Sequence, residues 1–282
     1  RACNRQEIEV VLLVGKKIPD DIVLRFNEVC IVKKDTIFDR FSFYWFLSKL
    51  ERKIFFTDNF LSIYLKKYKF DIVSHSELLS PLRSFKIINW IPDFQDLHLG
   101  YLFSEKEKKY RDKLYKKISA YSDAIVLSSN DSKKDYLSLI GNSNNVEVLH
   151  FVSQISEKFY APNQTKTQDY GLPKYYFYLP NQFWDHKNHI VAFEAINIAK
   201  ESYPEICLVC TGNMDNSKYV RSLIEYIKTN NLQKNIKLLG VIPYDDVLFI
   251  MSKAIAVINP SKFEGWSSTV EECKSMRKYL IL

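Results

Sequence analysis

The sequence has few glycines and no long apolar run. Its seven glycines stand so far apart that no two of them can form a dinucleotide-binding fingerprint or a phosphate-cradling loop. No run of about eighteen apolar residues occurs, and the first residues show no signal-peptide pattern. These absences argue against the usual NAD and ATP sites, and they predict neither a membrane-spanning helix nor an export signal.

Cysteine and metal-ligand patterns are also sparse. The five cysteines are odd in number and scattered, so they make no disulfide framework, and a reducing cytoplasm suits them better. Cys207 and Cys210 have the spacing of a redox motif, but they lie in an apolar, strand-like run, so we expect small buried side chains without chemistry. No Asp-x-Asp pair occurs, and the five histidines form no zinc constellation. The sequence therefore predicts no metal site.

Composition indicates a folded protein with two domains. A chain of 282 residues is long enough for two cores, and its 46% hydrophobic and 26% charged residues are typical of globular proteins. The net charge of +7 comes from lysines interspersed with acids, as in residues 104–117, and not from a dense basic block. We therefore expect no nucleic-acid partner, with weak attraction to an anionic membrane as the minor alternative.

Short apolar runs alternate with amphipathic stretches of helical length, which is the pattern of a parallel sheet covered by helices. In the first half we expect strands at 10–14, 71–75, 85–91, 124–129 and 146–151 and helices at 105–120 and 130–140, the second capped by Ser129. In the second half we expect strands at 175–180, 206–212, 236–240 and 254–260 and helices at 188–200, 217–230, 244–253 and 268–278. The sequence thus predicts an α/β fold of two tandem, doubly wound, Rossmann-like domains that face each other across a cleft.

A polar stretch with two prolines and a glycine separates the two halves. The predicted domains are residues 1–160 and 174–282, joined by a linker at 161–173. Both ends of the chain look truncated, because residues 1–6 resemble the tail of a helix and residues 279–282 stop as a strand begins.

The stretch FEGWSSTVEE, residues 263–272, follows an apolar strand and places carboxylates on both sides of a small polar turn. Ser268 and Glu271 have the spacing of a capping box, so Ser268 is expected to cap a helix and Glu271 to reach back to its amide. The start of that helix would present N–H groups that suit an anion. Glu264 and Glu272 would then accept hydrogen bonds from sugar or ribose hydroxyls. The alternative, two solvated surface acids, has equal support from the spacing alone.

FEGWSSTVEE resembles the E-x7-E signature of retaining, family-four glycosyltransferases of the GT-B fold (glycosyl transferases group 1), with Glu264 and Glu272 as its glutamates. Residues 88–104, INWIPDFQDLHLGYLFS, resemble a segment of bacterial members of that family. Residues 175–196 resemble the opening of their donor domain, and residues 239–268 the rest of the site. The resemblance implies a GT-B architecture with an acceptor-side N-terminal domain and a nucleotide-sugar-binding C-terminal domain.

The resemblance also implies a role for each matching residue. Glu272 would hold the ribose hydroxyls of a nucleotide sugar, and Glu264 would contact hydroxyls of the transferred sugar. Lys187 would neutralise the departing diphosphate, although without the family a solvated lysine is the better interpretation. The residues implied to line the sugar and phosphate site are Gly265, Trp266, Ser267, Ser268 and Thr269.

Two positions depart from the family pattern. The family often has an arginine six residues before the lysine, where this chain has the neutral Asn181, or Gln182 if the loop shifts. By its position, Asn181 is still implied to bind the donor. Many members have a His-Asp pair in the N-terminal domain, where this chain has Pro92 and Asp93, with His98 later in the same loop. Asp93 or His98 would orient the acceptor or the sugar. A turn-capping Asp93 and a packed His98 are equally supported.

The implied function is that of a retaining hexosyltransferase that moves a sugar from a nucleotide-diphosphate sugar to a hydroxyl acceptor, without a metal or other cofactor, in bacterial surface polysaccharide synthesis. The implied acceptor is a glycan or a lipid-linked glycan, and the implied location is the cytoplasm with peripheral contact at the inner face of the cell membrane. Two alternatives stay open. One is a sugar-nucleotide epimerase of the same architecture, and the other is a catalytically weak, nucleotide-sugar-binding partner subunit.

Overall fold

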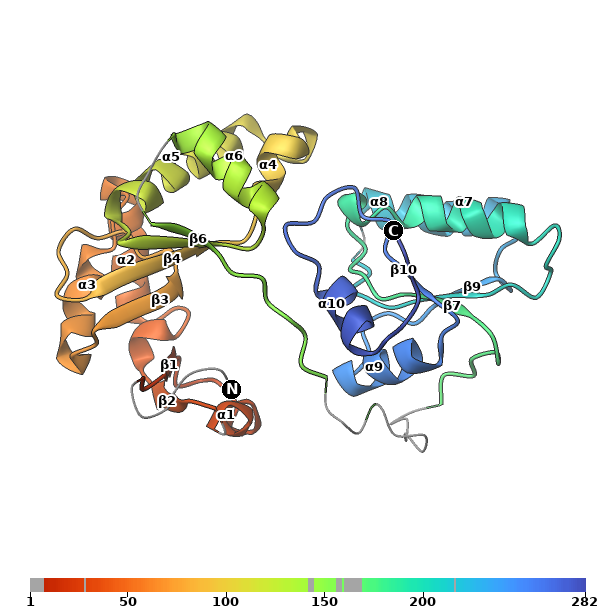
Figure 1. Cartoon of the computed structure of the whole chain (residues 1–282), viewed down its shortest axis with the longest axis horizontal. Helices are drawn as coiled ribbons and strands as arrows, with labels where there is room; N and C mark the ends of the chain where they lie inside the picture. Colours follow the sequence, from red (N-terminus) through yellow and green to blue (C-terminus); the bar gives the residue numbers. More distant parts are fainter. Residues whose placement is uncertain (1–7, 28, 142–144, 156–158, 160–168, 216) are drawn as a thin grey trace. The chain divides into compact units, whose positions relative to one another are not determined.

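The computed structural model describes residues 8–27, 29–141, 145–155, 159, 169–215 and 217–282 (Figure 1). The chain divides into two compact units. The first unit comprises Arg1–Trp90, Lys109–Val126 and Ile140–Glu147, and the second comprises Ile91–Lys108, Leu127–Leu139 and Val148–Leu282. The linker predicted at 161–173 lies largely outside the described residues. The domain boundaries therefore stay a prediction.

The second unit contains a five-stranded sheet in the order β11-β10-β7-β8-β9, and all its neighbouring strands are parallel. Its strands are β7 (Phe177–Leu179), β8 (Leu208–Cys210), β9 (Ile236–Leu238), β10 (Val257–Ile258) and β11 (Leu280–Ile281). Figure 1 shows α7 (His189–Ala199) and α8 (Lys218–Thr229) on one face, and α9 (Tyr244–Lys253) and α10 (Ser268–Ser275) on the other. This confirms the predicted doubly wound arrangement for the second half of the chain.

Both faces of this sheet are buried because successive strand side chains point to opposite sides. Tyr178 and Val209 join the core under α9 and α10, whereas Leu208 and Cys210 join the core under α7 and α8. Cys207 lies on the face opposite to Cys210, both are free thiols, and burial raises the pKa of each. The prediction of small buried cysteines is confirmed.

The strand order reverses between β7 and β10. From β7 the chain passes outward through β8 to β9, then crosses back to β10 and β11 on the other side of β7. In an open parallel sheet, ligands bind outside the carboxyl ends of the strands at such a reversal. The segments that follow β7 and β10, residues 180–188 and 259–267, begin at this edge.

The first unit has two sheets among its described residues. β1 (Val11–Val14) pairs in parallel with β2 (Ile31–Lys34). The second sheet has the order β3 (Ile72–Ser76), β4 (Lys86–Ile91), β5 (Ala124–Leu127) and β6 (Val146–Val148). The other described helices of the chain are α1 (Asp20–Asn27), α2 (Phe43–Phe55), α3 (Asn59–Leu65), α4 (Gln95–His98), α5 (Glu105–Tyr121) and α6 (Asn130–Ile140), with short 3-10 turns η1 (Thr36–Phe38), η2 (Lys66–Tyr68), η3 (Gly100–Leu102) and η5 (Asp185–Lys187).

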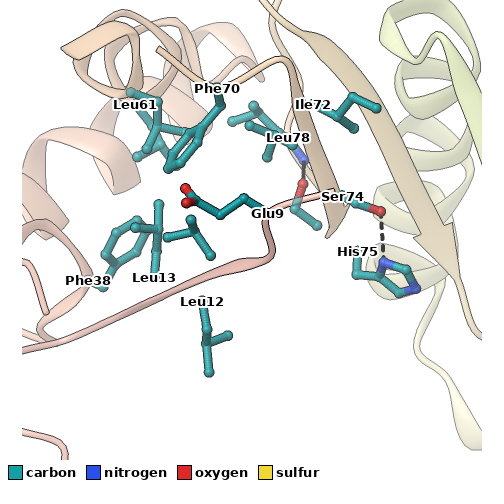
Figure 2. Close-up of a pocket in the computed structure, with 14 residues that line it drawn as sticks. Glu9, Leu12, Leu13, Phe38, Leu61, Phe70, Ile72, Ser74, His75 and Leu78 are labelled. Carbon is teal, nitrogen blue, oxygen red and sulfur yellow. Dashed lines mark hydrogen bonds between the residues drawn. The ribbon is translucent and has the colours of Figure 1, made fainter. Parts of the chain in front are cut away.

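A cavity of about 330 Å³ lies between β1 and β3 in the first unit. Figure 2 shows Leu13 and Phe38 on one side of it, Leu61 and Phe70 on the other, and the Glu9 carboxylate between them. Leu13, Leu61 and Phe70 contribute only part of their surface to the neighbouring hydrophobic core. Among the described residues, the cavity therefore separates the two sheets of the first unit, whereas the second unit has one continuous sheet.

The predicted helices at 105–120 and 130–140 match α5 and α6 to within a residue. The cap of the second helix is confirmed, because the Ser132 amide donates to Ser129 Oγ at 3.0 Å. In the part of the chain that the structure describes, no helix is both long enough and apolar enough to cross a lipid bilayer.

Candidate functional site

The candidate site lies at the carboxyl edge of β7 and β10, and hydrogen bonds join the segments that follow these strands. Asn188 Nδ2 donates to the Pro260 carbonyl at 3.1 Å, and the Lys262 amide donates to the His186 carbonyl at 2.8 Å. These bonds connect residues more than seventy positions apart in the chain. These bonds fix the two segments relative to each other, so the site residues predicted on one segment lie beside those predicted on the other.

Lys187 and Glu264 form the central contact of the site. Lys187 ends the short turn η5, and Asn188 then takes a left-handed backbone conformation with φ 57° before α7 begins. Lys187 Nζ donates to Glu264 Oε1 at 2.6 Å, and the two side chains are only 15% and 25% exposed. Lys187 is thus not a solvated surface lysine. Partial burial also makes this ion pair less screened by water than a surface pair.

The capping-box prediction at the start of α10 is wrong by one residue. Ser267, not Ser268, is the N-cap, because Ser267 has an extended backbone and its Oγ accepts the Val270 amide at 3.4 Å. Glu271 does not reach back; its Oε1 accepts from Lys274 Nζ at 2.7 Å. Ser268 instead opens the first helical turn, whose N–H groups have no acceptor within the helix. The start of α10 keeps its capacity to face an anion.

Glu272 lies on the α9 side of α10 and is 9% exposed. The Tyr244 hydroxyl, from the first turn of α9, donates to Glu272 Oε1 at 2.7 Å. Burial raises the pKa of Glu272, and the Tyr244 hydrogen bond opposes this rise. Tyr244 therefore orients the carboxylate, and Oε2 faces no donor among the described residues. Neither Glu264 nor Glu272 is the solvated surface acid of the alternative interpretation.

A buried amide network connects the ends of β7 and β10 with the start of α10. Asn181 Nδ2 donates to Asn259 Oδ1 at 2.8 Å, and Thr269 Oγ1 donates to Asn181 Oδ1 at 3.3 Å. The backbone of Asn181 also packs closely, since a Cβ added to Gly212, at φ +145°, would lie 2.3 Å from the Asn181 carbonyl oxygen. Asn181 thus uses both ends of its amide to hold the site together, and its role in donor binding stays a prediction.

Gly265 lies against the residues that follow β4 within the second unit. A Cβ at Gly265 would lie 2.5 Å from Asp93 Cβ and 2.6 Å from the Pro92 carbonyl oxygen, so this approach requires glycine. Asp93 Oδ1 accepts the Gln95 amide at 3.0 Å, which is the turn-capping contact. His98 is near the same loop: its Nε2 is 2.8 Å from Asp135 Oδ2, and its ring stacks on Phe263. The catalytic role of Asp93 and the acceptor-side role of His98 stay predictions.

Trp266 is anchored by its side chain. Its Nε1 donates to the Phe151 carbonyl at 2.9 Å, and its ring stacks on His150 with centroids 4.3 Å apart. With the indole engaged in this way, the backbone amide is the part of Trp266 that fits the predicted role in lining the sugar and phosphate site.

Two histidines beside Lys187 carry no charge at neutral pH. Burial, with a smaller contribution from the neighbouring Lys187, lowers the pKa of His186. Burial also lowers the pKa of His189 to about 4, and its ring stacks on Phe183 with centroids 4.2 Å apart. Positive charge at the site therefore comes from Lys187, from the start of α10 and from Lys262, whose Nζ is 3.0 Å from Asp185 Oδ1. Among the described residues, no three His, Cys, Asp or Glu side chains are grouped in a way that could hold a metal ion.

Sequence reasoning missed three residues of this site: Tyr244, Asn259 and Gly212. Each acts through a partner that is 28 to 78 positions away along the chain, and no local motif contains both members of a pair. The available signal was the position of Gly212 and Asn259 at the ends of predicted strands.

Residues 163–282 match the family described as "Glycosyl transferases group 1". The chain carries a glycosyl transferases group 1 domain. This domain contains all the residues predicted on the donor side, from Asn181 and Lys187 to Glu264 and Glu272. No curated protein sequence matches the chain.

Solved structures extend the likeness to the first half of the chain. The crystal structure of Anabaena HepE in complex with UDP and glucose has a TM-score of 0.67 and 13% identity, covering 96% of this chain and 72% of that chain. Sucrose-phosphate synthase from Thermosynechococcus elongatus has a TM-score of 0.64 and 14% identity, covering 96% and 70%. A glycosyltransferase from Rickettsia africae has a TM-score of 0.62 and 16% identity, covering 98% and 71%. This likeness shows that the glycosyl transferases group 1 domain belongs to a GT-B fold.

Proposed function

We propose that the chain is a retaining hexosyltransferase that moves a sugar from a nucleotide-diphosphate sugar to a hydroxyl acceptor. The contact between Lys187 and Glu264, at 2.6 Å beside the first turn of α10, carries the proposal. It puts a cation, helix amides and a carboxylate at the reversal of strand order within a glycosyl transferases group 1 domain. A cation and amides suit a diphosphate, and carboxylates suit sugar hydroxyls.

In the reaction, the bond between the anomeric carbon and the diphosphate oxygen breaks, and the acceptor oxygen forms a new bond on the same face of the sugar. The acceptor proton passes to the departing phosphate oxygen. Negative charge grows on that phosphate, where Lys187 and the amides of Ser268 and Thr269 stabilise it. Glu264, once Lys187 turns to the phosphate, accepts a hydrogen bond from the transferred sugar.

Glu272 accepts the ribose hydroxyls in this proposal, with Tyr244 as its positioning residue. The buried carboxylate already has Oε1 bound to Tyr244 at 2.7 Å, which leaves Oε2 to accept from a ribose hydroxyl. Asp93 and His98 orient the acceptor or the sugar, supported by the closeness of Asp93 to Gly265. Because Lys187 and the helix start supply the positive charge, the proposal needs no metal and no other cofactor.

The substrates are proposed from likeness. HepE from Anabaena has been solved with UDP-glucose, so a UDP-sugar is the first donor to test. We propose a glycan or lipid-linked glycan as the acceptor, in the synthesis of a bacterial surface polysaccharide. The corresponding location is the cytoplasm, with peripheral contact at the inner face of the cell membrane.

The test combines donor binding with turnover. UDP-, GDP- and dTDP-sugars are screened by thermal shift, since a ligand that binds the folded form raises the melting temperature. Glu272→Gln should lose most of the shift and of the transfer activity. The adjacent Glu271→Gln, whose carboxylate pairs with Lys274, should keep both. Wild-type turnover by Glu272→Gln would refute the site, and inversion of the anomeric configuration in the product would refute retention.

A further inference from the structure

Helix α2 in the first unit is rich in apolar residues, yet none of them is fully buried. Its sequence, FYWFLSKLERKIF, has eight apolar or aromatic residues out of thirteen. Tyr44, Trp45 and Leu47 are half-buried, and the other five are exposed. Ser42 caps it through the Trp45 amide at 3.0 Å, so the helix is well formed at its start. A helix of a folded domain normally turns its apolar stripe to the core. The exposed stripe of α2 therefore calls for another partner.

The exposed apolar residues of α2 lie on one face. Phe43, Phe46, Leu50 and Ile54 follow each other at intervals of three or four residues, and each is between 54% and 72% exposed. The neighbouring helix α3 extends this surface through Ile63, which lines an open, largely apolar groove together with Leu50 and Ile54. We call these five residues the α2 face. An exposed apolar patch of this kind marks an interaction surface.

The charges around the α2 face are not balanced. The two carboxylates of this region point inward: Glu51 accepts the amides of α3, and Asp58 accepts Arg52 through two bonds of 2.9 and 2.6 Å. Lys49 and Lys53 are instead exposed, along one flank of the apolar stripe. The acids are thus used within the protein, and the cations are presented to solvent beside the apolar residues.

Aromatic rings and cations are also paired at the start of α2. The Arg40 guanidinium lies over the Phe41 ring, 4.9 Å from its centroid, and Lys49 Nζ lies 5.8 Å from the Trp45 ring centroid. Phe41 has a left-handed backbone conformation with φ 65°, and its side chain is exposed. Aromatic rings, an apolar stripe and flanking lysines or arginines together are the composition of helices that lie in a membrane interface.

We propose that the α2 face docks the protein onto an anionic lipid bilayer. Phe43, Phe46 and Leu50 enter the boundary between headgroups and acyl chains, while Lys49 and Lys53 meet the anionic headgroups. A second copy of this chain is the weaker partner, because a two-fold interface would set the same lysine-flanked face against itself. Anionic lipid supplies both the apolar phase and the opposite charge. This inference rests on the peripheral membrane contact of the proposed function and names the surface that makes it. Because the α2 face lies in the first unit and the donor site in the second, vesicle binding can fail while sugar transfer holds.

The experiment measures sedimentation of the purified protein with vesicles, in the absence of any sugar nucleotide. The vesicles contain phosphatidylcholine with roughly one-third phosphatidylserine. Burial of each apolar side chain contributes about tenfold to the partition coefficient, so Phe46→Ser/Leu50→Ser should lower it about a hundredfold. Lys49→Gln/Lys53→Gln should lower it about thirtyfold, and vesicles of phosphatidylcholine alone should bind the wild type correspondingly weakly.

The matched control is Ile198→Ser/Val241→Ser in the second unit, where both residues are apolar and are 75% and 74% exposed. It should sediment like the wild type. Melting temperatures close to that of the wild type check that the variants fold, as expected for exposed positions. Equal sedimentation of the α2 variant and the control overturns the proposal. The proposal is also overturned if the wild type is a dimer that does not bind vesicles and if Phe46→Ser/Leu50→Ser makes it monomeric. That result would identify a second copy of the chain as the partner.

Discussion

The sheet of the second unit and the sheets of the first unit follow the same alternation of strands and helices, but only the former is continuous among the described residues. β7 pairs with β8 on one side and with β10 on the other, so the segments after β7 and β10 share one frame. β1 and β3 instead face a cavity, and Leu13 stays partly exposed beside it. The alternation of apolar runs and amphipathic stretches is enough to form strands and helices. The pairing of β7 with β10 at the centre of the sheet is what brings Lys187 close to Glu264.

The largest effect is expected at the continuous sheet. Lys187→Ala should lower the transfer rate on the order of a hundredfold or more, about 3 kcal/mol, because in the proposed reaction it removes a side-chain cation that stabilises the departing diphosphate. Steady-state kinetics with the donor found by thermal shift measure the change. Lys218→Ala, an exposed lysine at the start of α8, is the control and should keep the wild-type rate. Near-wild-type turnover by Lys187→Ala would show that the active site is not at the strand reversal.

Core truncation sharpens the contrast between the two sheets. Leu208 is fully buried in β8, and Leu208→Ala should lower the free energy of unfolding by about 3 kcal/mol. Leu13→Ala, at the cavity beside β1, should cost about 1 kcal/mol or less, because part of that side chain is already in water. Amide hydrogen exchange assigns each loss to its own unit. Equal losses would mean that the interrupted region is packed as tightly as the continuous one.

The smallest effect concerns Tyr244 and Glu272. Burial raises the pKa of Glu272 above 4.5, so from pH 4.5 up to the raised value the folded protein holds a proton that the unfolded chain has lost. This makes the free energy of unfolding fall as the pH rises through that window. Tyr244→Phe removes the hydrogen bond that favours the charged carboxylate. The pKa then rises further, and at neutral pH the variant should be about 1 kcal/mol less stable.

Melting temperatures from pH 4.5 to neutrality test this. The deficit of Tyr244→Phe should shrink towards the acidic end, where Glu272 is protonated in the folded state. Glu272→Gln should lack this contribution to the pH dependence. A deficit that is the same at every pH would show that Tyr244 acts by packing and not by orienting the carboxylate.

The second unit could be predicted well from the sequence because its signals are local. The apolar runs that become β7, β8 and β9 are bounded by polar or turn residues, and α5 and α6 in the first half have equally clear limits. The family resemblance assigned Lys187 and Glu264 to one site but did not predict the contact between them, whose physical basis is the strand order. Strand order is a property of the whole sheet, which no single segment contains.

The misses have the same explanation. The cap of α10 falls on Ser267 because the backbone there is extended, and two adjacent serines look alike in sequence. Tyr244 meets Glu272 across 28 positions through the packing of α9 on α10. For α2, the sequence analysis made no prediction, since periodicity marks an apolar stripe but does not tell whether a core covers it. The exposed α2 face could be recognised only once its neighbours were known.

In the proposed function, Lys187 and Glu264 also determine which anions bind at the site. An anion that approaches Lys187 competes with the Glu264 carboxylate, which is already 2.6 Å away. Its net gain is the difference between its own attraction to Lys187 and that of Glu264. Chloride or acetate carries the same charge as that carboxylate and gains little. A pyrophosphate carries more charge, and the sugar attached to it offers hydroxyls to the glutamate that it displaces. We therefore expect the pair to discriminate against abundant monovalent salts in favour of a ligand that satisfies both partners at once.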